Sequence, residues 1–154
     1  MKTAFFCFVL AISASAQERR TLKLNPFVGS GIAISWADGS RSVISTTGMA
    51  IILPITRRIF VRPLVATGAV LPLTTHEPFR LVQFGGLAGY QVTRRTSTLV
   101  GFAETIQFPK TGSIYLPTLL VSTATRIHRC FGLYTPIAIT QKAWSFSVQA
   151  GCSW

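Results

Sequence analysis

The sequence predicts an all-β protein, an eight-stranded antiparallel up-and-down transmembrane β-barrel that follows a cleaved signal peptide. Three observations predict this fold: apolar and polar side chains alternate with a period of two, turn signals recur at regular intervals, and charged residues gather in those turns. The composition agrees, because 49% of the 154 residues are hydrophobic and 12% are charged, while the net charge is +11. Soluble domains carry about 25% charged residues, so this chain differs from them.

The N-terminal segment has the features of a secretory signal peptide. Lys2 supplies a positive start, residues 4–12 are apolar, and Ala14-Ser15-Ala16 is a small-residue cleavage site. The apolar run is shorter than the ~20 residues that a membrane-spanning helix needs. We therefore expect residues 1–16 to be a signal peptide and residues 17–154 to form a single β-barrel domain.

The C-terminal segment gives the strongest strand signal. From residue 144 to 154, apolar side chains occupy every even position and small or polar side chains every odd position. A strand with this pattern has one apolar face, whereas a helix would scatter its aromatic residues around its surface. The same alternation recurs near residues 28–36, 61–73, 82–92, 115–122 and 131–140.

Turn signals separate these runs, with centres near residues 39, 57, 76, 94, 111, 128 and 141. Seven turns divide the mature chain into eight strands, which form an antiparallel meander. Prolines at positions 63, 117 and 136 conflict with regular strands, because each removes a hydrogen-bond donor from the ladder. We expect local bulges or strand ends at these prolines.

Two barrel architectures fit eight alternating strands. A soluble secreted lipocalin-like barrel keeps its apolar face inside, around a small apolar ligand, whereas a membrane barrel turns that face outward to lipid. Charge placement favours the membrane barrel, since a water-facing exterior would carry Lys and Glu along its strands. Six long segments contain no Asp, Glu, Lys or Arg: 42–56, 63–75, 81–93, 111–125, 130–141 and 143–154.

With these features the chain resembles the small eight-stranded bacterial outer-membrane β-barrel proteins. The resemblance rests on the N-terminal signal, the eight alternating strands and the terminal strand that ends in an aromatic residue. It implies localisation in the bacterial outer membrane and an N-terminus on the periplasmic side. It also implies that the barrel-assembly machinery reads the terminal strand, at Phe146, Val148, Ala150 and Trp154.

In that orientation, the basic residues of the turns collect at the periplasmic end of the barrel. This basic rim consists of Arg57, Arg58, Arg94, Arg95, Arg126 and Arg129. It has two interpretations: the rim binds anionic headgroups of outer-membrane lipids or another polyanion, or its arginines anchor the barrel without specific recognition. Nucleic acid is not an expected partner, because the chain is secreted and contains no groove-reading or stacking module.

Glu104 is an acidic residue in the middle of a predicted strand. Its position in the alternation would place it against lipid, where a carboxylate is costly. We expect a bulge near residues 101–103 to turn Glu104 inward, where it could form an ion pair with Arg62 in the lumen. Such a pair would be structural or would relay a proton or substrate.

The mature chain keeps two cysteines, Cys130 and Cys152. The predicted hairpin register places Cys152 opposite Phe131, so the two cysteines face opposite sides unless a one-residue bulge intervenes. The sequence leaves open whether they form a structural disulfide.

Catalytic chemistry receives no support from the sequence. His76 and His128 are predicted at opposite ends of the barrel, no serine motif accompanies His76-Glu77, and no spacing suggests a metal or cofactor site. An eight-stranded barrel is just wide enough for side chains to fill its interior, which excludes a wide pore. We therefore predict a non-enzymatic outer-membrane protein that serves membrane structure, surface interaction or at most a narrow pore. The alternatives are a lipid-modifying outer-membrane enzyme and the soluble ligand-binding barrel.

Overall fold

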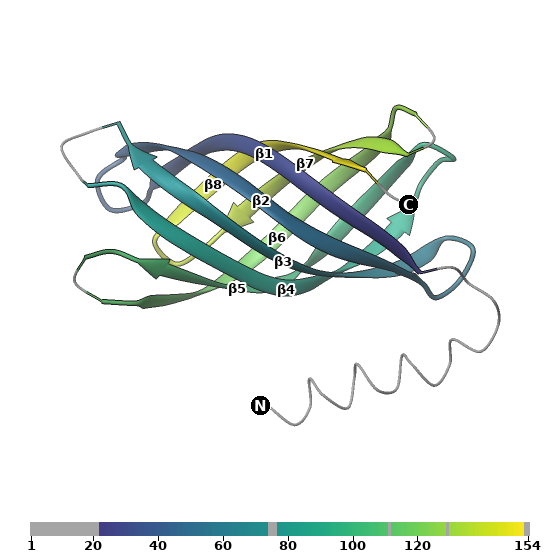
Figure 1. Cartoon of the computed structure of the whole chain (residues 1–154), viewed down its shortest axis with the longest axis horizontal. Coiled ribbons are helices and arrows are strands. Elements are labelled where there is room, and N and C mark those ends of the chain that lie inside the picture. Colours follow the sequence, from purple (N-terminus) through teal and green to yellow (C-terminus); the bar gives the residue numbers. More distant parts are fainter. Residues whose placement is uncertain (1–21, 74–76, 111, 129, 153–154) are drawn as a thin grey trace, which may run out of the picture.

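The computed structural model describes residues 22–73, 77–110, 112–128 and 130–152, which form a closed antiparallel barrel (Figure 1). The strands are β1 (Lys23–Ser35), β2 (Arg41–Pro54), β3 (Ile59–Pro72), β4 (Phe79–Gln91), β5 (Thr96–Phe108), β6 (Ile114–Arg126), β7 (Phe131–Ile139) and β8 (Ala143–Cys152). Each strand pairs with the next, and β8 pairs with β1 to close the barrel. The predicted eight-stranded meander is confirmed, while the predicted signal peptide lies outside the described residues.

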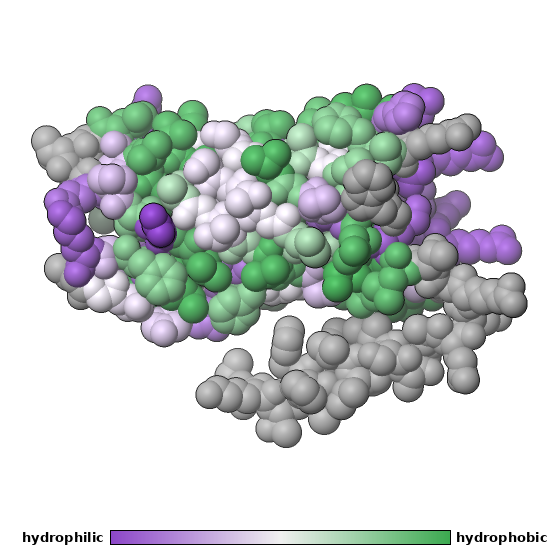
Figure 2. Space-filling view, viewed as in Figure 1, coloured by the Kyte–Doolittle hydropathy of each residue, from purple (hydrophilic) through white to green (hydrophobic). Residues whose placement is uncertain are grey.

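The outer face of the barrel is apolar. Phe102 is 70% exposed on this face, and the other large exposed side chains include Val28, Ile32, Met49, Val65, Phe84, Val100, Val121, Phe146 and Val148. Figure 2 shows apolar and weakly polar residues over the middle of the barrel and hydrophilic residues gathered at its ends. This arrangement is the reverse of a soluble lipocalin-like barrel and suits a surrounding of lipid hydrocarbon. The described residues contain no helix that is both long and apolar enough to span a membrane.

Small residues on the inner face let the strands coil tightly. A Cβ atom on Gly101 would lie 2.1 Å from the carbonyl oxygen of Gly86, and one on Gly85 would lie 2.3 Å from that of Phe102. Only glycine permits this approach. Consequently β4 and β5 curve around the barrel while their register stays continuous from Arg80–Phe108 to Gln91–Ser97.

The prolines do not produce the expected bulges. Pairing between β2 and β3 is interrupted beside Pro63 and resumes with the same offset, and pairing between β7 and β8 does the same beside Pro136. Pro117 pairs with Glu104 of β5 and lies beyond the part of β6 that pairs with β7. The expectation of bulges is therefore wrong. Closure of the barrel holds the register while each proline merely removes ladder bonds locally.

Three turns share one construction, in which a threonine hydroxyl closes the turn. The Oγ1 atoms of Thr56, Thr93 and Thr140 each accept hydrogen bonds of 3.0–3.2 Å from the backbone N–H groups two and three residues later. In the first two turns the residues that follow are Arg-Arg, whereas in the third they are Gln-Lys. The turn therefore needs its threonine and does not need arginine.

Buried side chains close the middle of the barrel. They form two clusters, and Leu64 packs against both of them. One cluster consists of Leu87, Leu99, Ala103 and Leu120, and the other consists of Phe27, Ala50 and Ala66. Cavities of about 430 and 530 Å³ lie at the two ends, and no described residue lines both. The interior is therefore packed between two separate cavities, as expected for eight strands.

Candidate functional site

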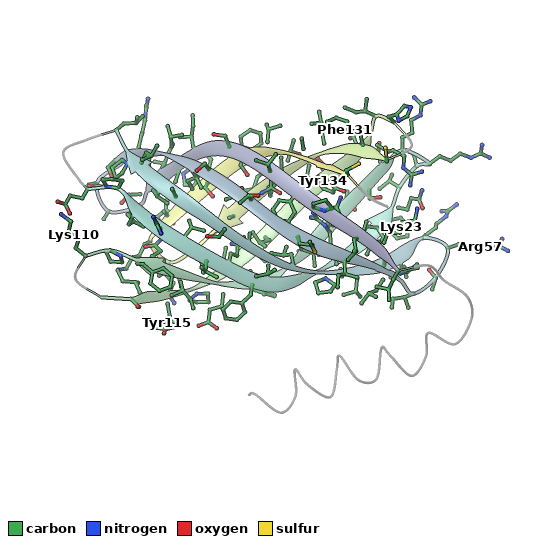
Figure 3. All side chains as sticks on the ribbon, in the orientation of Figure 1. Lys23, Arg57, Lys110, Tyr115, Phe131 and Tyr134 are labelled. Atoms are coloured by element: carbon green, nitrogen blue, oxygen red, sulfur yellow. The ribbon has the colours of Figure 1, made fainter. Side chains whose placement is uncertain are left out.

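The smaller cavity lies at the end of the barrel that carries the turns after β2, β4 and β6. Its volume is about 430 Å³, and we call it the basic cavity. Its charged lining residues are all cationic: Lys23, Arg57, Arg58, Arg62, Arg94, Arg95 and Arg126. Figure 3 shows Lys23 and Arg57 at this end and Lys110 at the other. A cavity with so many cations and no acidic lining residue attracts anions.

Arg62 of β3 forms the floor of the basic cavity. Only 3% of this residue is exposed, and its Nη2 atom donates a 2.8 Å hydrogen bond to Oδ1 of Asn25. The guanidinium carbon lies 4.3 Å from the ring centre of Tyr134 and 5.3 Å from that of Phe27. Asn25 is itself fully buried and donates through Nδ2 to the carbonyl oxygen of Cys152, at 3.1 Å. Neutral groups of β1 and β7 therefore fix the guanidinium, and β8 holds Asn25 in place.

No acidic side chain among the described residues balances the charge of Arg62. The described part of the chain contains one ion pair, between Glu77 and Lys110, and it is exposed at the opposite end. The Nε atom of Arg62 is buried and has no hydrogen-bond partner. Buried charges are normally paired, because removing a charge from water is costly. Among the described residues, no acidic side chain neutralises the charge of Arg62 and no acceptor binds its Nε–H group.

The expected ion pair between Arg62 and Glu104 does not form. Glu104 lies exposed on the outer face of β5, opposite Phe84 of β4 and Pro117 of β6, and the register around it contains no bulge. The strict alternation of the strand keeps its side chain outside, because glycine at position 101 accommodates the curvature without an inserted residue. Glu104 forms no ion pair and no hydrogen bond with the described residues.

The basic rim predicted from the sequence is largely brought together. Arg57, Arg58, Arg94, Arg95 and Arg126 all line the basic cavity, while Arg129 lies outside the described residues. The sequence reasoning missed that Arg62 is the floor of the same cavity and that Asn25 and Tyr134 hold it. A signal was present, since each of these three residues occupies an inward position in the alternation of its strand.

Arg58 also reaches the outer surface. Its Nη1 atom donates a 3.3 Å hydrogen bond to the hydroxyl of Tyr90, an exposed residue on the outer face of β4. This bond raises the pKa of Arg58 above its ordinary value. Tyrosine is typical of the membrane–water boundary of such barrels, so Arg58 lies where lipid headgroups would be.

The larger cavity, at the opposite end, is polar and nearly uncharged. Hydroxyl and amide groups inside it satisfy one another: Gln83 Nε2 donates to Thr105 Oγ1 at 3.0 Å, and Thr105 and Thr118 share a 2.8 Å hydrogen bond. At its edge, a hydrogen bond from the backbone of Ser40 lowers the pKa of Asp38 to about 2. This cavity contains no buried uncompensated charge and is the weaker candidate for a binding site.

The terminal strand and the cysteines lie apart from the basic cavity. Phe146, Val148 and Ala150 are on the outer face of β8, and Trp154 lies outside the described residues, so their role in assembly stays a prediction.

The predicted pairing of Phe131 with Cys152 is confirmed. Cys130 and Cys152 are free thiols that lie near each other. Cys130 precedes β7, so the alternation of that strand does not fix its direction, and the expectation that the two cysteines face opposite sides stays a prediction.

The described residues bring together no group of three or more His, Cys, Asp or Glu side chains that could bind a metal. His76 lies outside the described residues, and its neighbour Glu77 pairs with Lys110. His128 lies in the turn between β6 and β7, at the end of the basic cavity. Within the described residues, His128 therefore belongs to no recognisable catalytic group.

No protein-family model and no curated protein matches the chain. Several solved structures share its fold. A designed transmembrane β-barrel is 12% identical, with a TM-score of 0.63 over 90% of this chain and 100% of the other. The N-terminal β-barrel domain of Pseudomonas aeruginosa OprF is 9% identical, with a TM-score of 0.56 over 86% and 96%. Ail, the attachment invasion locus protein of Yersinia pestis, is 10% identical, with a TM-score of 0.54 over 86% and 98%.

A second structure of Ail, in complex with the heparin analogue sucrose octasulfate, is 12% identical to this chain, with a TM-score of 0.53 over 88% of this chain and 100% of the other. At these identities the comparisons establish the fold alone. The chain is a transmembrane β-barrel with the architecture of the small eight-stranded outer-membrane proteins.

Proposed function

We propose that this protein is a non-enzymatic integral protein of the bacterial outer membrane, delivered by the signal peptide at residues 1–16. It serves membrane structure or surface interaction, and its basic end faces the periplasm and binds anionic groups at the membrane surface. One observation carries the proposal: an apolar belt, interrupted by Glu104 of β5, surrounds the barrel, while the cations of the basic cavity gather at one end.

The arginines at this end are more than parts of a turn. The turn at Thr140 has the same hydrogen bonds as those at Thr56 and Thr93 without an Arg-Arg pair. Guanidinium groups bind phosphate through two parallel hydrogen bonds, and each basic residue near an anionic surface contributes about 1 kcal/mol. The Ail complex with a sulfated sugar supports the general chemistry, since another small barrel binds a polyanion.

A wide diffusion pore is not part of the proposal. The packed layer around Leu64 separates the two end cavities, so a solute entering one cavity meets buried side chains before it reaches the other. The conductance of the inserted barrel should therefore be very small. The proposed roles of the protein are therefore at the two membrane surfaces and do not include transport through the barrel.

The proposal can be tested in two stages. First, the protein expressed in a Gram-negative host should remain in the outer-membrane fraction after alkaline carbonate extraction. Second, the purified barrel should associate with vesicles that contain phosphatidylglycerol more strongly than with phosphatidylcholine vesicles, and added salt should weaken the difference.

The variant to compare replaces Arg57, Arg58, Arg94 and Arg95 by Gln, which should abolish the preference for anionic vesicles. The matched control replaces Arg41, Arg80, Lys110 and Lys142 by Gln. These four residues belong to the other end of the barrel, so the control should retain the preference. Recovery of the protein in a soluble fraction without detergent contradicts the membrane assignment. Equal vesicle binding by both variants contradicts the role of the basic end.

A further inference from the structure

We propose that the basic cavity is a binding site for a phosphate group, with Arg62 as its innermost ligand. This inference rests on the proposed function and deepens it, because it names the chemical group that the cavity at the basic end would bind. Its test uses the barrel in detergent, so its failure is distinguishable from a failure of the vesicle test above. The phosphate belongs either to a free phosphorylated solute or to a lipid headgroup that enters the open mouth, and the two sources share the same chemistry at the site.

The first support is that the structure fixes Arg62 before any ligand arrives. The hydrogen bond to Asn25 holds one arm of the guanidinium, and the rings of Tyr134 and Phe27 lie against it. Asn25 is held in turn by the carbonyl oxygen of Cys152. A preorganised donor loses little conformational entropy when a ligand binds.

The second support is the charge that these contacts leave unbalanced. Asn25 is neutral, and the aromatic rings attract the cation only through their quadrupoles. The Nε atom of Arg62 remains buried without a partner, although the residue lines the basic cavity. Arg62 as a whole residue is only 3% exposed, and a buried charge without an acidic partner is stabilised most by an anion that contacts it directly.

The third support is the character of the remaining lining. Six further cationic side chains surround the cavity, and Thr56, Ser97 and Thr125 add hydroxyl donors. This concentration of charge favours an anion with more than one negative charge over a single carboxylate. The volume of about 430 Å³ exceeds the ~30 Å³ that one water occupies many times over, so a phosphate with an attached group fits.

The experiment uses the folded full-length barrel in a zwitterionic detergent at low salt. Inorganic phosphate and a short-chain lysophosphatidic acid are titrated separately by isothermal calorimetry. The proposal expects saturable binding of at least one probe. Stronger binding of inorganic phosphate identifies a free solute as the source, whereas stronger binding of the lysolipid, relative to an uncharged lysolipid, identifies a headgroup.

Two variants test the role of Arg62. Arg62→Gln should weaken binding by at least about tenfold, as expected for loss of a charged hydrogen-bond donor. Asn25→Asp keeps the size of the partner and gives Arg62 a carboxylate, although it also replaces the Nδ2 donor to the carbonyl oxygen of Cys152 by an oxygen. This variant keeps the arginine and should still lose binding by a similar factor. Arg80→Gln, on the outer face at the opposite end, should bind as the wild type does.

Folding of each variant is checked by its gel migration before and after boiling. If Arg62→Gln fails to fold, Asn25→Asp decides the outcome, provided that its gel migration matches that of the wild type, because it keeps Arg62 and neutralises its charge. If both variants fail to fold, the titration of the wild type alone decides whether the cavity binds phosphate. Absence of saturable binding of both probes overturns the proposal. Wild-type affinity in Asn25→Asp also overturns it, and Arg62 is then a structural residue only.

Discussion

Arg62 and Asn25 are hydrogen-bonded to each other inside the barrel, where Nη2 of the arginine lies 2.8 Å from Oδ1 of the asparagine. Asn25 continues the chain of contacts to the backbone of Cys152, so the pair links β3 and β1 to β8 across the closing seam. The residues that form the floor of the basic cavity are thus also residues that hold the barrel closed. Substitution of Arg62 or Asn25 should therefore affect both the basic cavity and the stability of the barrel.

Asn25→Leu should destabilise the barrel strongly. The substitution removes both hydrogen bonds of the buried amide and leaves the guanidinium of Arg62 with aromatic contacts alone. We expect the free energy of unfolding to fall by about 3 kcal/mol, the upper range for a hydrogen bond to a charged group. Urea unfolding in vesicles, followed by tryptophan fluorescence, measures it. A change within experimental error would mean that the seam does not depend on this amide.

Thr56→Val should weaken one turn while its neighbour Arg57→Gln should not. The Thr56 hydroxyl accepts hydrogen bonds from the backbone N–H groups of Arg58 and Ile59, and valine keeps the shape without the acceptor. We expect a loss of about 1 kcal/mol in the free energy of unfolding for Thr56→Val and almost none for Arg57→Gln. The same urea titration compares them. Equal losses would show that the turn depends on arginine after all.

Glu104→Gln should stabilise the inserted barrel. The carboxylate lies on the outer face between Phe84 and Pro117, and an ionised group facing hydrocarbon is unfavourable. Its removal should raise the free energy of unfolding in vesicles by about 1 kcal/mol, which is less than for a lysine at the same depth. The control Glu77→Gln, at the exposed ion pair, should change it little. A loss of stability in Glu104→Gln would place this residue in an interaction with a partner.

Cys130 and Cys152 should form a disulfide under oxidising conditions. Both are free thiols near each other, one just before β7 and one at the end of β8, where Cys152 pairs with Phe131. After mild oxidation of the folded barrel, mass spectrometry of proteolytic fragments should find the two peptides linked and neither thiol open to alkylation. Cys130→Ser should restore alkylation of Cys152. Persistent labelling of both thiols in the oxidised sample would exclude the bond.

Most of the fold could be predicted from the sequence, because alternation along a strand is a local property. The outward positions of Val28, Phe84 and Phe146 follow from it directly. The predicted inward position of Glu104 is wrong, because the energetic cost of a carboxylate that faces lipid does not override that alternation. The structure keeps the alternation and leaves the carboxylate outside.

The floor of the basic cavity could not be predicted in the same way. Asn25, Arg62 and Tyr134 lie on β1, β3 and β7, which are not neighbouring strands. They meet because the strands tilt and stagger around the closed barrel, and that stagger is set by pairing of the first strand with the last. A sequence gives the facing direction of each residue but not the height at which distant strands bring their residues together.

The most direct test of the central claim, that the chain folds as a compact membrane barrel, is its gel migration in sodium dodecyl sulfate before and after boiling. A closed barrel resists this detergent at room temperature, because its backbone hydrogen bonds are satisfied within the sheet. The protein refolded in detergent should migrate faster unboiled than boiled. Identical migration of the two samples, together with solubility in the absence of detergent, would contradict the barrel described above.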